Sequence, residues 1–527
     1  MGQAELLIAG LLVAVAGLSA FARLVSVPYP IVLVIGGALF GFIPGMPEVK
    51  LNPDVVLVVF LPPLLYAAAF FANLGDIRQM TRAVALSSVL LVLVTMCAVA
   101  VAAHELVEGM SWAAAFTLGA IVSPTDPLAA AAIMRRLSVP RRMVSIVEGE
   151  GLFNDATALV AYRVAIAAAV GGSFSLANAS LKFVVGAAGG VAIGLVTGWV
   201  IAKIRERVQD TQTSVTISLL SGYAAFIPAD LAGVSGVLAA VTTGIYMGIR
   251  GPSIIGPRTR LQGFMVWDLL DFIINAALFV LIGLQLRTIV DGLSGHDAAS
   301  LAGYALVISV VVIVVRVAWS LGVAFIIRAI DRRPSQRARR STWQTRLVIG
   351  WSGMRGAVSL AAALAIPLTT DAGGPFPDRD LILFLTFAVI FATLVVQGLT
   401  LPWVIHKLGV TDDGDGESEE LKARIVATRA ALDRLDVLAE EDWTRDETIE
   451  RMRALYDYRQ RRFYARAGKI EDDGYEDRSL AYQQMVVSVL AAERDALVQL
   501  RNEGMISNEV MNRLLYDFDL EEERLEI

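Results

Sequence analysis

The sequence predicts an all-α, polytopic membrane protein followed by a helical tail, and three features lead to this prediction. The chain has 527 residues, of which 56% are hydrophobic, and its mean hydropathy is +0.61. Apolar runs of about twenty residues recur up to about residue 405, each long enough to cross a hydrocarbon core of roughly 30 Å. After residue 410 the sequence becomes polar and charged. A soluble globular protein does not carry this much apolar sequence.

The apolar runs number about thirteen, and we interpret each as one membrane-spanning helix. The first is too long for the core of a signal peptide and has no basic region before it, so we count it as a true span. With bounds good to a few residues, the segments lie near 4–22, 27–43, 54–72, 83–103, 111–134, 143–170, 182–202, 212–229, 232–249, 264–287, 299–327, 344–368 and 381–405.

Basic residues are distributed unevenly between the connecting loops. With the N-terminus outside, the short loops on the side of the tail hold roughly 21 Lys and Arg, and the opposite loops hold about four. The run 328-RAIDRRPSQRARR-340 contributes much of this excess. Because cytoplasmic loops carry the excess of Lys and Arg, we predict an external N-terminus and a cytoplasmic C-terminus in the plasma (inner) membrane.

The chain divides into a membrane part, 1–410, and an acidic tail, 411–527. The tail opens with 411-TDDGDGESEE-420 and holds 30 acidic and 17 basic residues. This acidity argues against a nucleic-acid partner. Helical spacing of apolar residues predicts an amphipathic helix that packs on the tail itself or on a second copy of the chain. That stripe consists of Leu421, Ile425, Leu432, Leu435 and Leu438.

The sequence offers little for a resident metal or cofactor. Cys97 is the one cysteine, so neither a disulfide within the chain nor a CxxC metal site is possible. His104, His296 and His406 fall at predicted membrane interfaces and far apart in sequence. We therefore predict no cofactor and no metal beyond a transported monovalent cation.

Two of the predicted spans, the fifth and the twelfth, carry signals that break a helix. In 119-GAIVSPTDPLAAAAI-133, Pro124 and Pro127 remove backbone donors and disfavour helix before them. In 349-IGWSGMRGAVSLAAALAIP-367, three glycines loosen the chain around Arg355. Interrupted helices in corresponding positions of two halves are typical of transporters built from inverted repeats, with the site at the midplane.

The predicted site lies on the fifth and sixth segments, where 148-EGEGLFNDATALVAY-162 interrupts an apolar run with several polar groups. Asp126 and Asp155 each fall about halfway across the membrane, and an ionisable residue at that depth indicates function. A carboxylate can hold either a proton or a small hard cation. Asn154, Thr125 and the carbonyls of the unwound segment could supply further oxygens. The cation itself would lie between Asp155 and Thr125.

Two further charges are predicted to pair inside the membrane. Glu150 lies one turn before Asn154, and Arg355 is the nearest candidate for an opposite charge. A lone buried charge is rarely tolerated. We expect a structural ion pair between Glu150 and Arg355, with a direct role in transport as the alternative.

These residues resemble the NhaP/NHE-type sodium/proton exchangers. The motif GEGLFNDA at 149–156 is similar to the family's sixth-helix motif. Four other stretches agree in order across about 400 residues: 61-LPPLLYAAAF-70, 123-SPTDP-127, 353-GMRGAVSL-360 and 397-QGLT-400. The tail is not covered by this resemblance.

The resemblance implies a homodimer in which an ion-carrying core moves against a dimerisation scaffold by alternating access. It implies that H⁺ and the cation compete at Asp155, with Asn154 beside it. It places Asp126 and Thr125 in an unwound crossing and makes Glu150 and Arg355 a stabilising pair. An Asn-Asp pair, rather than two Asp, implies electroneutral exchange of Na⁺ for H⁺ in pH homeostasis.

Two departures from the family leave the transported cation open. Many members have Glu at the position of Ala67, and many have Ser at the position of Gly151. Either side chain could help to hold the ion, so K⁺ or Li⁺ stays an alternative to Na⁺.

Two other functional classes explain fewer residues. An intramembrane aspartyl protease also needs two Asp on neighbouring spans, but neither Asp126 nor Asp155 lies in a Gly-x-Gly-Asp motif. A cation channel needs repeated carbonyl loops or charged rings as a filter, and the sequence shows neither. The prediction is therefore a secondary transporter and not an enzyme.

Overall fold

A computed structural model shows a helical protein made of two compact units, Met1–Asp412 and Asp413–Ile527. The structure describes residues 3–25, 27–44, 56–73, 75, 84–171, 176–291, 293, 297–330, 342–412, 414–471 and 473–525. Within these residues there is no strand, only one isolated bridge between Thr369 and Pro375. The all-α prediction is therefore confirmed for the described part of the chain.

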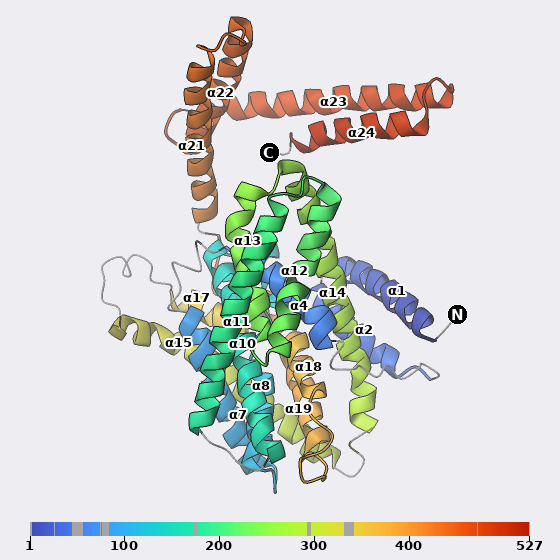
Figure 1. Cartoon of the computed structure of the whole chain (residues 1–527), viewed down its shortest axis with the longest axis vertical. Coiled ribbons are helices and arrows are strands. Elements are labelled where there is room, and N and C mark those ends of the chain that lie inside the picture. The colour runs from blue at the N-terminus through green and yellow to red at the C-terminus, as the bar shows by residue number, and fades with distance from the viewer. Residues whose placement is uncertain are drawn as a thin grey trace. The chain divides into compact units, whose positions relative to one another are not determined.

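The first unit contains helices from one end of its sequence to the other (Figure 1). In chain order they are α1 Gln3–Leu24, α2 Tyr29–Gly41, η1 Val56–Phe60, α4 Leu61–Phe70, η2 Leu86–Leu91, α7 Val92–Leu106, α8 Trp112–Val122, α9 Pro127–Arg136, α10 Arg141–Gly171, α11 Leu176–Arg205, α12 Thr211–Leu231, α13 Gly236–Ile254, α14 Pro257–Asp291, α15 Ala298–Ile330, α17 Trp343–Trp351, α18 Ala357–Leu364, α19 Arg379–Ala392, η3 Thr393–Gln397 and α20 Gly398–Lys407.

Many of these helices have the length and composition of membrane spans. In the described residues, 8 helical stretches are long and apolar enough to cross a bilayer, and three shorter apolar helices accompany them. Every one of the predicted apolar segments coincides with one or more helices, although some fall below those criteria. The chain is thus a multi-pass membrane protein, and the number of thirteen spans stays a prediction.

The helices of the first unit form two packing groups. In the first helix group, α4, α11, α12 and α13 pack on one another, and α14 lies along α2 and against α12. In the second helix group, α10 packs on α8 and α9, α15 packs on α7 and α17, and α19 packs on α15 and α18. Apolar side chains of both groups fill the space between them.

Small residues bring α4 and α13 into close contact within the first helix group. A Cβ atom on Gly244 would lie 2.6 Å from the carbonyl oxygen of Tyr66, and one on Gly248 would lie 2.8 Å from that of Phe70. These glycines lie four residues apart, so they share one face of α13. This GxxxG spacing allows membrane helices to approach backbone to backbone.

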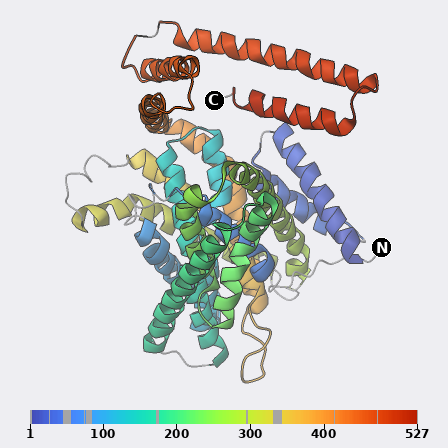
Figure 2. The ribbon, with the colours of Figure 1, turned by 45° about the horizontal axis from the view of Figure 1, so that its top comes forward.

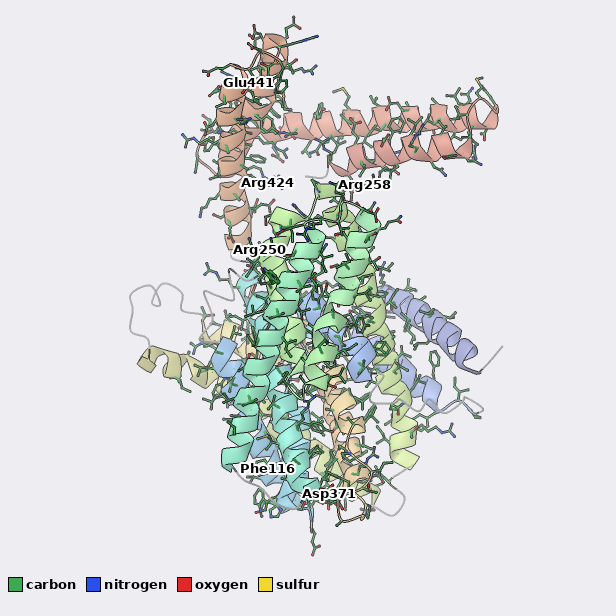
Figure 3. All side chains as sticks on the ribbon, viewed as in Figure 1. Phe116, Arg250, Arg258, Asp371, Arg424 and Glu441 are labelled. Carbon is green, nitrogen blue, oxygen red and sulfur yellow. The ribbon has the colours of Figure 1, made fainter. Side chains whose placement is uncertain are left out.

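The two ends of the first unit differ in the residues that they carry. Arg250, at the end of α13, and Arg258, at the start of α14, lie at one end of the bundle (Figure 3). Phe116 of α8 and Asp371, in the loop after α18, lie at the opposite end. We refer to these as the Arg258 end and the Asp371 end.

The second unit consists of four helices: α21 Asp415–Leu438, α22 Asp446–Arg466, α23 Tyr475–Asn502 and α24 Asn508–Glu523. In α21 the stripe predicted from the sequence is the covered side, since Leu421, Ile425 and Leu435 are buried. Leu421 and Ile425 pack against Phe463 of α22. Helices α23 and α24 pack side by side, as Figure 2 shows.

Candidate functional site

The chain between α8 and α9 is not helical, and its polar groups are placed by the second proline. Pro127 occupies the first position of α9, where its missing N–H costs nothing. Asp126 caps that helix, because its side chain accepts a hydrogen bond of 2.9 Å from the backbone N–H of Leu128. Residues 123–126 therefore expose backbone groups to the interior of the second helix group.

A second non-helical stretch, between α17 and α18, meets the first. The backbone N–H of Asp126 donates to the carbonyl oxygen of Met354 at 2.9 Å. A methyl group added to Gly356 would overlap the carboxylate of Asp126. Any other residue would require the Asp126 side chain to shift, which explains one of the glycines that the sequence places around Arg355. The two interruptions thus touch at Asp126, at the start of α9 and of α18.

Asn154 of α10 is fixed against the first interruption. Its amide nitrogen donates to the carbonyl oxygen of Thr125 at 3.3 Å and to the hydroxyl oxygen of Thr125 at 2.7 Å. A carbonyl oxygen can only accept, so the nitrogen must be the atom that faces Thr125. The other amide atom, Oδ1, is then an acceptor that is buried and has no hydrogen-bond partner.

Asp155 follows Asn154 on α10 and is 9% exposed. Its carboxylate interacts electrostatically with Asp126 and with the guanidinium of Arg355. The backbone of Arg355 is held in place, since its N–H donates to the hydroxyl of Thr393 at 3.0 Å. Asp155, Asp126, Asn154 and Thr125 therefore come together, as the sequence predicts for a cation site.

Glu150 does not pair with Arg355, so this prediction is wrong in the described structure. Glu150 forms a buried ion pair with Arg316 of α15 instead. The reason is helix geometry: positions 150 and 155 of α10 point about 140° apart. Arg355 interacts with Asp155, and the Glu150 side of α10 is occupied by Arg316.

The surroundings of Glu150 satisfy its polar groups. The hydroxyl of Thr125 donates to its carboxylate at 3.4 Å, and the hydroxyl of Ser88 donates to its backbone carbonyl at 3.2 Å. Sequence reasoning missed Arg316, although it lies inside the apolar run 299–327. A charge in such a run is itself a signal of a buried partner.

Both departures from the family pattern fall at tightly packed positions. A Cβ atom on Gly151 would lie 2.6 Å from the ring of Pro127, so a serine would need that ring to move. Ala67 is 3% exposed and belongs to an apolar cluster with Met247 and Trp267. In the described structure neither residue has a side-chain oxygen to offer to the site.

The sequence is similar to known proteins over most of its length. Residues 10–407 match the model of a family described as sodium/hydrogen exchanger, transmembrane. An uncharacterized Na(+)/H(+) exchanger of Mycobacterium tuberculosis is 35% identical over 500 residues, which cover 94% of this chain and 91% of that protein. The Na(+)/H(+) antiporter ApNhaP of Aphanothece halophytica is 30% identical, covering 93% and 91%.

Two further comparisons extend these findings. A sodium, potassium, lithium and rubidium/H(+) antiporter of Bacillus subtilis is 34% identical over 390 residues, 71% of this chain and 57% of that protein. The fold is similar to the solved structure of the sodium proton antiporter MjNhaP1 from Methanocaldococcus jannaschii. That similarity has a TM-score of 0.60 at 17% identity and covers 77% of this chain and 99% of the other.

Proposed function

Because this chain belongs to the family of transmembrane sodium/hydrogen exchangers, we propose that it exchanges Na⁺ for H⁺ with Asp155 as the shared binding site. A family member of this kind is a secondary transporter and not an enzyme. Two chemical requirements follow for the site. It must present oxygen atoms to a small cation, and one of them must also be able to take up a proton.

The unpartnered oxygen of Asn154 carries this proposal. A buried acceptor without a donor is unfavourable by about 1–3 kcal/mol, so proteins keep one only for a reason. The adjacent Asp155 side chain, when ionised, is also only an acceptor. An amide oxygen next to a carboxylate is a poor arrangement for a neutral ligand and a good one for a hard cation.

Thr125 would complete the site from the non-helical stretch. Its hydroxyl oxygen accepts from Asn154 and donates to Glu150, and its carbonyl also accepts from Asn154. An oxygen that accepts one hydrogen bond has a lone pair left for an ion. Asp126 would hold the crossing together through its cap on α9 and its contact at Gly356, and it would add negative potential close to Asp155.

Competition at Asp155 would couple the two fluxes. A proton or a monovalent cation neutralises the carboxylate, so each loaded form of the carrier has the same net charge. An empty Asp155 would leave an uncompensated charge in a site of low dielectric, which opposes the passage of the empty carrier. Exchange would therefore be one for one and electroneutral.

The architecture supports alternating access as the route. We infer that α8–α9 and α17–α18 are the broken helices of two inverted repeats, which places the site near the middle of the membrane. The second helix group would carry the ion, and the first helix group would be the scaffold of a homodimer. The excess of basic loops supports a plasma-membrane protein with an external N-terminus and a cytoplasmic tail.

Potassium or lithium is the second candidate for the cation. Ala67 and Gly151 remove two oxygens that many relatives have, and fewer fixed oxygens discriminate less between cations of different size. The relative from Bacillus subtilis is named for sodium, potassium, lithium and rubidium.

The test uses the full chain in liposomes that contain a pH dye. Sodium, potassium and lithium would be added separately, with and without a clamp on the membrane voltage. We expect a Na⁺-driven pH change that is insensitive to voltage and lost in Asp155→Asn. A folded protein that moves no protons with any cation, or an Asp155→Asn variant that exchanges normally, would refute the proposal.

A further inference from the structure

The surface between the two helix groups is apolar along most of α10. Leu152, Ala156 and Leu159 lie at spacings of four and three residues, so they form one stripe along that helix. The stripe packs against side chains of α4, α12 and α13, among them Leu65 and Phe226. Apolar contacts have no directional bonds, so the two surfaces can move past one another without breaking any.

This apolar contact ends in an ion pair. Arg163 follows Leu159 by four residues on α10, and Asp230 follows Phe226 by four residues on α12, so each continues the face that precedes it. Nη2 of Arg163 donates to Oδ1 of Asp230 at 2.8 Å. The two side chains are 55% and 47% exposed, so water or lipid headgroups can reach them.

The ion pair crosses between the helix groups, unlike the others described in the membrane unit. Glu150–Arg316 and Arg135–Glu148 each join helices of the second helix group. Lys203 and Glu206, 2.7 Å apart, lie at the end of α11 in the first helix group. A change in the relative position of the two groups leaves those pairs intact and stretches Arg163–Asp230.

The pair lies toward the Asp371 end of the bundle. The carbonyl of Val170, near the end of α10, accepts from the backbone N–H of Asp371 at 3.3 Å. Helix α12 begins at the other end, where the hydroxyl of Thr211 lies 3.0 Å from that of Thr259. Arg163 is eight residues beyond Asp155, or about 12 Å along the helix. The ion pair therefore lies between Asp155 and the Asp371 end.

We propose that Arg163 and Asp230 form a clasp that holds the two helix groups together at the Asp371 end and that must open in every transport cycle. The inference rests on the proposed function, because it takes Asp155 as the site that is opened to each side in turn. Arg163 and Asp230 are positioning residues, since neither contacts Asp155. In the conformation seen here the clasp is formed, and it lies between Asp155 and the Asp371 end.

A reversible cross-link tests whether the clasp must open. Arg163→Cys and Asp230→Cys would be combined with Cys97→Ser in the full chain, because Cys97 is the one native cysteine. The protein would be treated with a bifunctional thiol reagent whose bridge contains a reducible disulfide, and cross-linking would be measured by mass spectrometry. We expect Na⁺-driven pH change in liposomes to fall to the level of Asp155→Asn and to return after reduction.

Each other outcome of this experiment has a definite meaning. Cross-linked protein that exchanges at the rate of the reduced protein would overturn the clasp while leaving the proposed function intact. Failure of the cross-link to form in folded protein would also overturn it, because the side chains would then not face each other. Reduced protein and wild type that both move no protons would refute the proposed function itself.

Swapping the charges of Arg163 and Asp230 by mutation gives a second test, which needs no cross-linking reagent. Arg163→Asp and Asp230→Arg should each change the maximal exchange rate, and the double variant should return toward wild type. Neutral Arg163→Gln should shift the rate by about 1.5- to 5-fold, the range expected for an exposed ion pair. Lys203→Gln is the matched control and should leave the rate unchanged. Single reversals without effect, or a double variant no better than either, would contradict the clasp.

Discussion

Glu150 and Asp155 are two carboxylates on one helix, five residues apart, with opposite surroundings. Glu150 is 2% exposed, and its groups are taken by Arg316, Thr125 and Ser88. Asp155 follows Asn154, whose buried amide oxygen has no donor. Burial of a charge alone therefore does not identify a transport site. What distinguishes the two is whether the surrounding polar groups are already satisfied.

The largest loss of stability is expected when Glu150 loses its partner Arg316. Arg316→Met leaves Glu150 buried without its cation, and the loss of one partner of a buried pair costs about 3–5 kcal/mol. The double variant Glu150→Leu/Arg316→Met should recover most of that stability, since an apolar pair of similar volume needs no compensation. Thermal unfolding of the purified protein measures both.

Arg355→Met is the matched control for this prediction. Its guanidinium forms no ion pair with Glu150, so its removal should lower the melting temperature less than Arg316→Met does. Equal losses for the two variants would mean that Asp155 depends on Arg355 as strongly as Glu150 depends on Arg316, and the contrast between the two carboxylates would weaken.

A smaller loss of stability is expected at Gly356, where the two non-helical stretches meet. Gly356→Ala forces a methyl group against the carboxylate of Asp126, and such overpacking costs about 1–3 kcal/mol. Gly303→Ala, on α15, meets nothing within 4 Å and serves as the control. It should be neutral or slightly stabilising, because alanine favours helix over glycine. A Gly356→Ala variant as stable as Gly303→Ala would show that the crossing can relax.

Removal of the unpartnered oxygen of Asn154 tests whether this oxygen contributes to Na⁺ binding near Asp155. Asn154→Leu loses the hydrogen bonds to Thr125 together with the free acceptor, so the changes in stability partly cancel. Affinity for Na⁺ should fall about tenfold, which corresponds to about 1.4 kcal/mol. The measurement is the Na⁺ concentration that gives half-maximal exchange. An unchanged value in folded protein would remove Asn154 from the site.

The smallest effect on exchange is expected when the second unit is removed. All residues of the proposed site lie in Met1–Asp412, so a chain that ends after Val410 should still exchange Na⁺ for H⁺. Its maximal rate should stay within a few-fold of the full chain, as measured in liposomes. Complete loss of exchange in stable protein would show that the tail takes part in transport.

The sequence predicted the helices better than it predicted the contacts between them. Hydropathy and the two helix-breaking stretches depend on local composition, and the structure has helices at each predicted segment. Asp126, Asn154 and Asp155 stand out in the sequence because they are polar groups in apolar runs, and their role as a cation site stays a prediction. The partner of Glu150 was missed, because pairing depends on the direction in which each side chain leaves its helix.

Two contacts in the membrane unit have no local signal in the sequence. The free oxygen of Asn154 follows from its contact with Thr125, which is 29 positions away in the sequence. The pair of Arg163 and Asp230 joins helices 67 positions apart. Such long-range geometry depends on how the helix groups pack, and composition does not contain it.

The central claim is that H⁺ and Na⁺ exclude each other at Asp155, and proton release on binding tests it most directly. Purified full-length protein would be titrated with Na⁺ in weakly buffered solution at several pH values, with Asp155→Asn and Glu150→Gln in parallel. The account predicts that Na⁺ binding releases up to one proton per site, that Asp155→Asn abolishes the release, and that any folded Glu150→Gln protein keeps it. Sodium binding without proton release, or undiminished release in Asp155→Asn, would contradict it.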